Sequence, residues 1–367
     1  MPRDEASKEQ IFKLPRPLPR PMLALGGQMK ACLALGIGRD VVVSSELGDL
    51  GTPRGLDALE TTALDLQHRY GVRAQDLVCD AHPRYTGTRW ARAQSGANVR
   101  HVFHHHAHAA AVAGEFPEEP RWLCFTWDGV GLGPDGTLWG GEALLGAPGF
   151  WQLGATFRPF APPGGEQASR EPWRSAASLA WALGMDFSPP DRNVALAKAA
   201  WGKGVNSPST SAVGRLFDAA ASFLNLVHEA GFEAEGPIAV QAAASASVGV
   251  ETAVKLPLRR RADGVLEADW APLVPMLRDE RWPTGGRAST FHASMAMTLA
   301  VQAIVLRKLH GDFAIGLSGG VFQNALLARL AQDALGQARF RVYLPKAHPY
   351  HDGGLSFGQI VEAASGA

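Results

Sequence analysis

Residues 99–116 read VRHVFHHHAHAAAVAGEF and hold five of the chain's twelve histidines within eight positions. The first part, VRHVF, has the β-branched and aromatic residues that favour a short strand. The second part, HHHAHAAAVAGE at 104–115, is rich in alanine, the residue with the highest helix propensity. This stretch therefore predicts a strand that runs directly into a helix, and the helix begins with a cluster of imidazoles.

The same order of strand and helix recurs on both sides of this stretch. Short apolar runs that end at polar or glycine residues predict buried strands, and apolar residues with a 3.6-residue period predict helices. The expected strands include DLVCD at 76–80, RWLCFTWD at 121–128, TLWGGEALLG at 137–146, FAIGL at 313–317 and FRVYLP at 340–345. The expected helices include 55–71, 291–310, 321–335 and a last helix after the turn DGG at 352–354, with mostly helix over 170–260. Strands that alternate with helices predict an α/β fold.

Length and composition fit a cytoplasmic protein of about two domains. The chain has 367 residues, 46% of them hydrophobic, and a formal net charge of zero, so its overall charge does not favour a nucleic-acid partner. No apolar run is expected to reach the ~18 residues of a membrane span, and no membrane partner is expected. The N-terminus MPRDEASKEQ has no apolar signal core. The three cysteines, Cys32, Cys79 and Cys124, favour buried thiols in a reducing compartment.

The chain divides into an N-terminal segment and two lobes. Residues 1–22 end in KLPRPLPRPM, and alternating proline and basic residues predict an extended linker, such as the tail of a preceding domain. An N-terminal lobe is expected over 23–117 and a C-terminal lobe over 118–352. The last helix, 353–367, is expected to pack back on the N-terminal lobe.

The histidine cluster has the spacing of a metal site. His104 and His108 are four residues apart, so on a helix their rings share one face and can reach one cation. Asp128 follows a hydrophobic strand, and Asp352 lies in the glycine turn before the last helix. A mixed set of imidazoles and carboxylates suits zinc, iron or manganese and leaves positions open for a substrate. Packed histidines and ordinary Asp-Gly turns remain alternatives on the residues alone.

Two glycine turns are candidates for a nucleotide site. IGLSGGVFQN at 315–324 runs from a strand through Gly319 and Gly320 into a helix, whose N-terminus attracts phosphate or polar groups. DGVGLGPDG at 128–136 is a second glycine-rich strand end. Neither is a P-loop, because the Lys-Ser/Thr pair is missing. Each turn taken alone is also explained as an ordinary tight turn.

Several stretches together resemble the C-terminal half of the HypF carbamoyltransferase family. They are HHHAHAAAVAGE at 104–115, DGVGLGPDGTLWGGE at 128–142, PPGGEQASREPWRSA at 162–176, VGRLFDAAASFL at 213–224, LSGGVFQNALL at 317–327 and DGGLSFGQ at 352–359. The similarity covers about residues 20–365. That half of HypF is similar to Kae1 and TsaD in the actin/Hsp70/sugar-kinase superfamily. The resemblance implies two RNase H-like lobes with a nucleotide cleft between them.

The resemblance also implies a set of site residues. A divalent metal, zinc or iron, would be held by His104, His108, Asp128 and Asp352. ATP or carbamoyl-adenylate would be bound by Gly129, Gly131, Asp218, Gly236, Gly319, Gly320 and Asn324, with Asp218 on the ribose and Gly236 in the adenosine pocket. Arg170 and Arg174 in SREPWR are candidate catalytic residues that would meet an anionic carbamoyl or phosphate group, although ordinary structural arginines fit the pattern as well.

The function implied is carbamoyl transfer from carbamoyl-adenylate to the C-terminal cysteine of HypE, a step in making the cyanide ligand of [NiFe]-hydrogenase. The acylphosphatase, zinc-finger and YrdC-like parts of the family have no match in this chain. A separate protein is therefore expected to supply carbamoyl-adenylate, unless this domain makes it alone. The alternatives are a tRNA threonylcarbamoyltransferase, a small-molecule O-carbamoyltransferase and a non-catalytic nucleotide-binding scaffold that docks HypE.

Departures from the family pattern gather around the expected cleft. Val130 replaces a threonine whose hydroxyl can bind phosphate, and Leu132 replaces a tyrosine. His351 precedes Asp352 where the family has asparagine, and it is a further candidate for the metal shell. AEGPIA at 234–239 replaces YEGQAA, and SSELGDL at 44–50 replaces SQHIGDL. These changes are expected to alter nucleotide affinity or activity.

Overall fold

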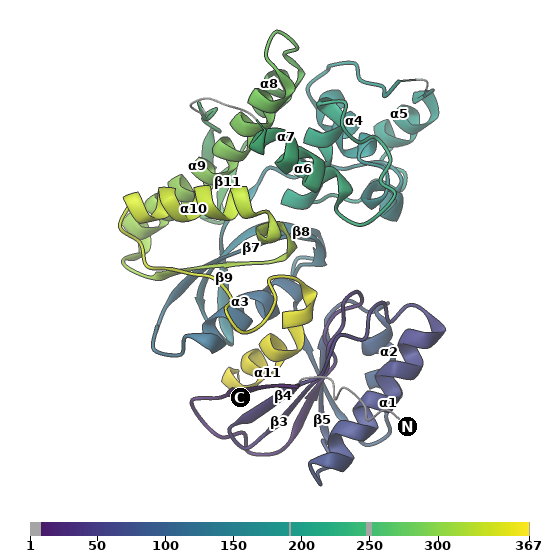
Figure 1. Ribbon diagram of the computed structural model, residues 1–367, viewed down its shortest axis with the longest axis vertical. Coiled ribbons are helices and arrows are strands. Elements are labelled where there is room, and N and C mark those ends of the chain that lie inside the picture. Colours follow the sequence, from purple (N-terminus) through teal and green to yellow (C-terminus); the bar gives the residue numbers. More distant parts are fainter. Residues whose placement is uncertain (1–8, 191, 247–251, 367) are drawn as a thin grey trace.

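The computed structural model describes residues 9–190, 192–246 and 252–366. Within them the chain forms two β-sheets that are covered by helices (Figure 1). Figure 1 places the N-terminal sheet in one half of the molecule and the C-terminal sheet in the other, with α3 and α11 between them. The expected α/β class with two lobes is confirmed.

The N-terminal lobe contains a six-stranded sheet in the order β1-β4-β3-β2-β5-β6. Its elements are β1 (Gln10–Lys13), β2 (Met22–Ala24), β3 (Ala34–Ile37), β4 (Asp40–Val43), α1 (Pro53–Arg69), β5 (Asp76–Asp80), α2 (Thr86–Ala93) and β6 (Asn98–Val102). Strands β2, β5 and β6 are parallel, and β3 is antiparallel to both of its neighbours. Without β1, this is the RNase H-like strand order.

The two faces of this sheet are buried by different helices. Successive side chains of a strand point to opposite faces. Met22 and Ala24 accordingly pack on the side of α11 (Leu355–Ser365), whereas Leu23 packs in the cluster that includes α1. The alternation explains why these strands are apolar at consecutive positions.

The proline-rich N-terminal segment is not a free linker, so the expectation for residues 1–22 was wrong over its described part. Residues 10–13 form β1, which pairs antiparallel with β4 at the edge of the sheet. Leu14 and Leu18 are buried beside α11. Proline is tolerated here because an edge strand and the chain after it need few ladder hydrogen bonds. Residues 1–8 lie outside the described residues.

The C-terminal lobe repeats the arrangement in a seven-stranded sheet, ordered β10-β11-β9-β8-β7-β12-β13. Its strands are β7 (Trp122–Leu132), β8 (Leu138–Ala147), β9 (Phe150–Phe157), β10 (Leu258–Arg260), β11 (Leu266–Ala268), β12 (Ala314–Ser318) and β13 (Val342–Tyr343). Strand β8 is antiparallel to β7 and β9, and β7, β12 and β13 are parallel. The five strands β9-β8-β7-β12-β13 thus have the RNase H-like order of the first lobe.

Helix α3 (His104–Glu115) lies between the two sheets, as Figure 1 shows. One side packs Ala109, Val112 and Ala113 against Trp122 and other residues of the C-terminal sheet. Its other side packs on α11, which covers the N-terminal sheet. Helix α3 therefore contacts elements of both lobes, and the expected lobe boundary at residue 117 stays a prediction.

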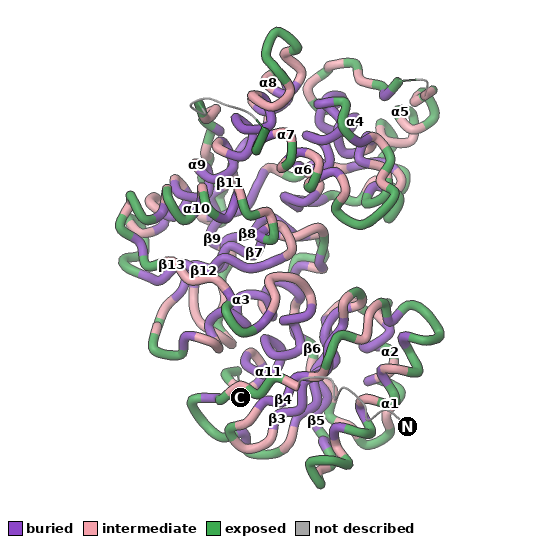
Figure 2. The backbone as a smooth tube through the Cα atoms, in the orientation of Figure 1, coloured by how far each residue is buried: buried purple, intermediate pink, exposed green. Residues whose placement is uncertain are grey.

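Helices cover the far side of the C-terminal lobe. They are η1 (Gly165–Ser169), α4 (Trp173–Ala182), α5 (Ala195–Gly202), α6 (Val213–Phe223), α7 (Glu235–Ser245), α8 (Leu273–Arg278), α9 (Thr284–His310), η2 (Gly320–Gln323) and α10 (Ala325–Gln337), and a short turn η3 (Asp352–Gly354) leads into α11. Figure 2 shows the buried residues concentrated in the sheets and in the helices that face them. All three cysteines are buried and unpaired, as expected.

Among the described residues, α9 is the one helix long and apolar enough to cross a membrane. In the structure 72% of its most apolar window is buried, and the helix packs against α7, α8 and α10. The expectation that no apolar segment reaches this length was wrong. The burial explains the apolar composition by packing in the core of the lobe.

Candidate metal centre and nucleotide site

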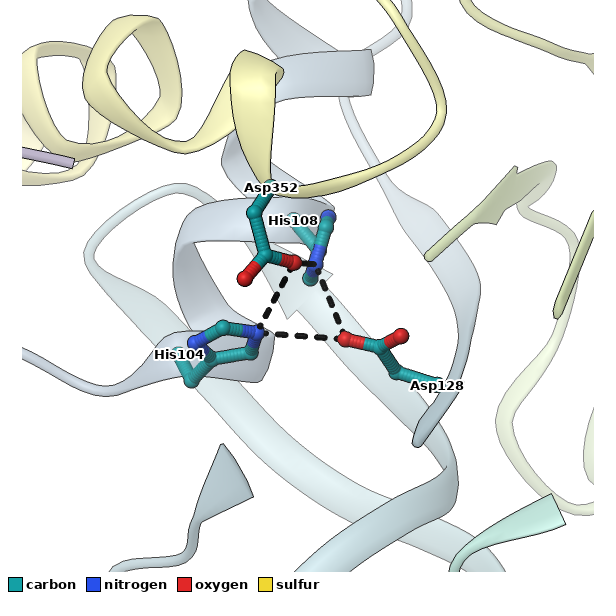
Figure 3. Close-up of side chains that lie close together, drawn as sticks. All are labelled: His104, His108, Asp128 and Asp352. Atoms are coloured by element: carbon teal, nitrogen blue, oxygen red, sulfur yellow. Dashed lines mark hydrogen bonds and ion pairs between the residues drawn. The ribbon is translucent and has the colours of Figure 1, made fainter. Parts of the chain in front are cut away.

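Four side chains from segments far apart in the sequence meet at one point (Figure 3). One ligand atom each of His104, His108, Asp128 and Asp352 lies within 4.8 Å of those of the other three. His104 Nε2 lies 3.2 Å from Asp128 Oδ2 and 3.6 Å from Asp352 Oδ1. His108 Nε2 lies 3.5 Å and 3.7 Å from the same two oxygens. The structure thus brings together the four residues expected to hold a metal.

The first two turns of α3 place both imidazoles on one side of the helix. His104 and His108 are each only 1% exposed. Strand β7 crosses this helix end at Gly131, where a Cβ atom would lie 2.6 Å from His105 Cε1 and 2.9 Å from His104 Cβ. A residue with a side chain at position 131 would therefore collide with these two histidines and push β7 away from α3.

Asp128 lies within β7 rather than at its end, which corrects the expected strand boundary. The pairing of β7 with β8 shifts register between Trp127 and Gly131. Such an irregularity turns a side chain away from the regular alternation of a strand. The other carboxylate oxygen, Asp128 Oδ1, accepts a hydrogen bond of 3.2 Å from the backbone N–H of Gly320. The second glycine turn therefore helps to orient this carboxylate.

Asp352 begins the short turn that leads into α11. The chain before it is held by Glu115 at the end of α3, whose carboxylate accepts from the backbone N–H groups of Lys346, Ala347 and His348 at 3.0–3.3 Å. Helix α3 thus carries two of the expected metal ligands at its start, and its last residue holds the loop that leads to the third ligand, Asp352. His351 is not among the four gathered residues, and its Nδ1 accepts from the N–H of Gly353.

Asp80 supports the site from the N-terminal sheet, and sequence reasoning missed it. It ends β5, and its Oδ2 lies 3.0 Å from His104 Nδ1. A proton on Nδ1 that is donated to this carboxylate leaves the lone pair of Nε2 facing the cluster. His108 is oriented in the same way by Ser318 Oγ, which lies 3.4 Å from its Nδ1. The sequence shows an acidic residue at the end of the predicted strand DLVCD, but no spacing or motif connects this residue with His104.

The carboxylates of Asp128 and Asp352 favour positive charge at this site. Burial disfavours a charged imidazole, but Asp352, Asp128 and Asp80 outweigh burial and raise the pKa of His104 well above its ordinary value. Burial would raise the pKa of Asp352, but His104 and His108 lower it to about 2. The same two histidines hold the pKa of Asp128 well below its usual range. The carboxylates therefore favour positive charge at this point, which protonated imidazoles would supply without a metal and a bound cation would supply with neutral imidazoles.

The donor set fits a divalent metal. His108 Nε2 is buried and has no hydrogen-bond partner within the described residues, although it points into the cluster. A buried polar atom without a partner is costly unless a ligand satisfies it. Two imidazole nitrogens and two carboxylate oxygens suit zinc or iron and leave coordination positions free.

The residues expected to bind a nucleotide lie around α6. Asp218 on α6 is buried, and burial raises its pKa to about 6 despite the neighbouring Arg215. A Cβ atom on Gly236, at the start of α7, would lie 3.3 Å from Asp218 Oδ1. Helix α6 also packs against β7, η1 and η2. The structure therefore groups Asp218 and Gly236 beside the strand that carries Asp128.

The glycines of both turns make close backbone contacts. Gly319 has φ +99°, and a Cβ atom there would collide with the backbone oxygen of Trp127. A Cβ atom on Gly320 would lie 2.9 Å from Asp128 Oδ1. At Gly129, by contrast, only a guanidinium nitrogen of Arg215 lies within 4 Å, apart from the adjoining residues. The space beside Gly129 is therefore open, whereas Gly319 and Gly320 are needed for packing.

Asn324 is committed to contacts within its own lobe. Its Oδ1 caps α10 by accepting from the N–H of Leu327 at 3.0 Å. Its Nδ2 lies 2.9 Å from Nε2 of the buried His292. Both ends of the amide thus have protein partners, and the expected nucleotide contact stays a prediction.

The two candidate catalytic arginines lie at the end of η1 and the start of α4. Arg170 has an exposed side chain. Arg174 forms an ion pair of 3.0 Å with Glu171 and stacks over the ring of Trp173. No contact joins either arginine to the four gathered residues in the part of the chain that the structure describes. Their catalytic role stays a prediction.

Two family descriptions match consecutive parts of the chain. "HypF Kae1-like domain" matches residues 18–115, and "Carbamoyltransferase, Kae1-like Domain, second subdomain" matches residues 124–359. A HypF homolog from Cupriavidus necator is 33% identical over 369 residues, which cover 94% of this chain and 91% of that protein. The chain belongs to the HypF family.

Other HypF relatives are longer than this chain. The carbamoyltransferase HypF of Synechocystis sp. is 33% identical over 96% of this chain but only 48% of its own length. The chain therefore spans about half the length of several curated HypF proteins. A crystal structure of full-length HypF in a phosphate- and nucleotide-bound form is 24% identical, with a TM-score of 0.91 over 97% of this chain. This likeness confirms the fold.

Three positions where the chain departs from the HypF pattern, Val130, Leu132 and His351, lie close in the sequence to Asp128 or Asp352. Val130 is 46% exposed within β7, between the glycines that follow Asp128. Leu132 is half-buried at the end of the same strand. The effect of Val130, Leu132 and His351 on activity stays a prediction.

Proposed function

We propose that the chain transfers the carbamoyl group of carbamoyl-adenylate to a cysteine thiolate, the C-terminal cysteine of HypE, in maturation of [NiFe]-hydrogenase. The observation that carries the proposal is the convergence of His104, His108, Asp128 and Asp352 in a chain of the HypF family. A non-catalytic scaffold would have no need of this buried and costly set of charges.

The reaction that this site suits is an acyl transfer. The thiolate sulfur attacks the carbamoyl carbon, a C–S bond forms, and the bond from that carbon to the phosphate oxygen breaks as AMP leaves. When bound, the metal supplies a Lewis acid for the oxygen on which negative charge develops. His104 and His108 would hold it as neutral ligands, and Asp80 keeps His104 in the tautomer that this requires.

The nucleotide part of the substrate would lie along α6. Asp218 would accept from the ribose hydroxyls, and the lack of a side chain at Gly236 leaves room beside it. Fixing the adenylate in this way orients its carbonyl relative to the attacking sulfur, a contribution of up to ~7–11 kcal/mol in ideal cases.

The attacking thiol would come from a partner. Cys32, Cys79 and Cys124 are all buried, and burial raises the pKa of Cys79 to about 11 and that of Cys32 to about 12. Thiols in such surroundings are poor nucleophiles. An exposed carrier cysteine suits the reaction better, and the buried free thiols of this chain fit a reducing compartment such as the cytoplasm.

The activated carbamoyl group would come from another protein or domain. The chain matches the Kae1-like part of HypF, and the proposal assigns it the transfer step alone. Synthetic carbamoyl-adenylate therefore replaces the missing step in a test.

The test is to incubate the metal-loaded full chain with synthetic carbamoyl-adenylate and HypE, and to measure the mass of HypE. The proposal expects one carbamoyl increment on the terminal cysteine and an equal amount of AMP. The Asp352→Asn chain, which keeps the size of the side chain, should lose the increment. Binding of HypE without any increment would instead favour the scaffold alternative, and carbamoylation of tRNA or a small acceptor would favour the other two.

A further inference from the structure

Arg215, on the first turn of α6, uses only part of its guanidinium for contacts within the protein. Its side chain is 18% exposed. Nη1 forms an ion pair of 2.8 Å with Asp218 Oδ2 and donates to the backbone oxygen of Ala168 at 3.1 Å. These two contacts fix the orientation of the guanidinium plane.

The other edge of this guanidinium has no partner. Nε is buried and makes no hydrogen bond within the described residues. Nη2 likewise donates no hydrogen bond among the described residues and lies 3.6 Å from the point where a Cβ atom on Gly129 would be. The Nε and Nη2 edge is the fork with which arginine binds carboxylates and phosphates through two parallel hydrogen bonds. The fork is therefore unused among the described residues, and its Nη2 lies beside the open space at Gly129.

The surroundings of Gly129 favour an anion. Gly129 directly follows the expected metal ligand Asp128. The first turn of α6 approaches the same point, since a Cβ atom on Gly214 would lie 2.8 Å from Gly129 Cα. Ala212, at the cap of α6, offers no side-chain hydrogen bond to the helix, so the positive end of the helix dipole is not neutralised there by a cap.

We propose that Arg215 binds the phosphate of the adenylate through Nε and Nη2, over Gly129 and beside the metal ligands. The proposal rests on the proposed function. It places the phosphate next to Asp128 and the ribose at Asp218, which is the order of these groups in an acyl-adenylate. Asp218 then has two roles, because it accepts from the ribose and holds Nη1 of the arginine that binds the phosphate.

The consequence is that the affinity for a nucleoside monophosphate exceeds that for the nucleoside. Charge-assisted hydrogen bonds to a desolvated phosphate make AMP bind about 10–100-fold more tightly than adenosine. If the fork is removed, AMP loses its advantage over adenosine, but the contacts with the adenine and the ribose stay. If Arg215 had only a structural role, its substitution would weaken the binding of AMP and of adenosine by the same factor.

The test measures dissociation constants of AMP and adenosine by calorimetry with the full chain at a fixed metal content. Arg215→Gln removes the charge and the fork, and it should bind the two ligands with equal affinity. Arg215→Lys keeps the charge without the fork, and it should retain a small part of the preference and keep α6 folded. Arg329→Gln is the matched control, because Arg329 is 62% exposed and, among the described residues, pairs only with Asp333 on α10.

Three results would overturn the proposal in different ways. If Arg215→Gln and Arg215→Lys both keep the wild-type preference for AMP, the phosphate is not bound by Arg215. The chain still binds the nucleotide in that case, so the proposed function is not contradicted. If the wild-type chain binds neither AMP nor adenosine, the proposal fails together with the proposed function. If both variants bind AMP and adenosine more weakly by the same factor, the proposal is also overturned, because that result gives Arg215 a structural role.

Discussion

At the scale of single residues, the site depends on how each ligand is held as well as on its identity. His104 faces the cluster with Nε2 because Nδ1 is bound to Asp80, which lies at the end of β5 in the N-terminal sheet. Asp80 is itself fixed, since its Oδ1 accepts from the backbone N–H of His82 at 2.7 Å. A partner of this kind orients a ligand and increases its basicity.

We predict that Asp80→Ala weakens metal binding by roughly 10–100-fold, because His104 loses the partner that selects its tautomer. Asp80→Asn keeps an accepting oxygen and should lose less. Competition titration of the metal with a chelator measures both. Unchanged affinity in Asp80→Ala would show that the contact with Asp80 is not needed.

Residues that act through local spacing were predictable, and those that act across the fold were not. His104 and His108 are recognisable because a helix places positions four apart on one side. Asp80 and Arg215 contribute through contacts with His104 and with the space beside Gly129, which only the packed structure brings about. Asp128 and Asp352 were candidates because they lie at a strand end and in a glycine turn, and the family resemblance then joined them with the two histidines.

At the scale of elements, Glu142 on β8 connects β9 with the residues that lead into α6. Its Oε2 accepts from the N–H groups of Gly140 and Gly141 at 2.6 and 2.8 Å, and its Oε1 accepts from Thr156 Oγ1 at 3.0 Å and from Ser211 Oγ. The carboxyl group is buried, and burial raises its pKa to about 7 even though these donors lower it. The link therefore depends on a group that titrates near neutral pH.

We predict that Glu142 makes the chain less stable as pH rises from about 4.5 to about 7. In this range the folded state holds the proton more tightly than the unfolded state, whose pKa is near 4.5, so stability from this group is present below pH 4.5 and lost as pH approaches 7. Glu142→Gln should remove up to about 1.4 kcal/mol per pH unit of this slope. Urea unfolding of both chains between these pH values tests it, and parallel curves would contradict the prediction.

Elements with a clear local pattern were predictable, and those defined by their neighbours were not. The helix at 104–115 has the bounds that its alanine-rich sequence indicates. β1 was missed, because the prolines that follow it indicate a linker and only β4 provides its pairing. The end of β7 was placed four residues too early, because the glycines after Asp128 indicate a turn where the structure continues the strand with a shifted register.

At the scale of the whole molecule, the candidate metal centre lies where the two lobes meet. Asp128 belongs to the C-terminal sheet, whereas Asp352 leads into α11, which covers the N-terminal sheet. A Cβ atom on Gly27 of the N-terminal lobe would lie 3.2 Å from Asp352 Oδ2. A bound metal would therefore connect elements from both lobes.

We predict that a divalent metal stabilises the whole molecule and not one lobe alone. At a concentration one hundred times its Kd, the metal should add about 2.7 kcal/mol to the free energy of unfolding. Scanning calorimetry with and without zinc should show one transition that shifts upward. Asp352→Asn should abolish the shift, and a shift confined to one of two separate transitions would contradict a shared centre.

The most direct measurement is anomalous diffraction from crystals of the metal-loaded chain at the absorption edge of the metal. The account predicts one peak at about 2.0–2.2 Å from His104 Nε2, His108 Nε2 and a carboxylate oxygen of both Asp128 and Asp352. A fully loaded crystal whose only peak lies away from these four groups would contradict it.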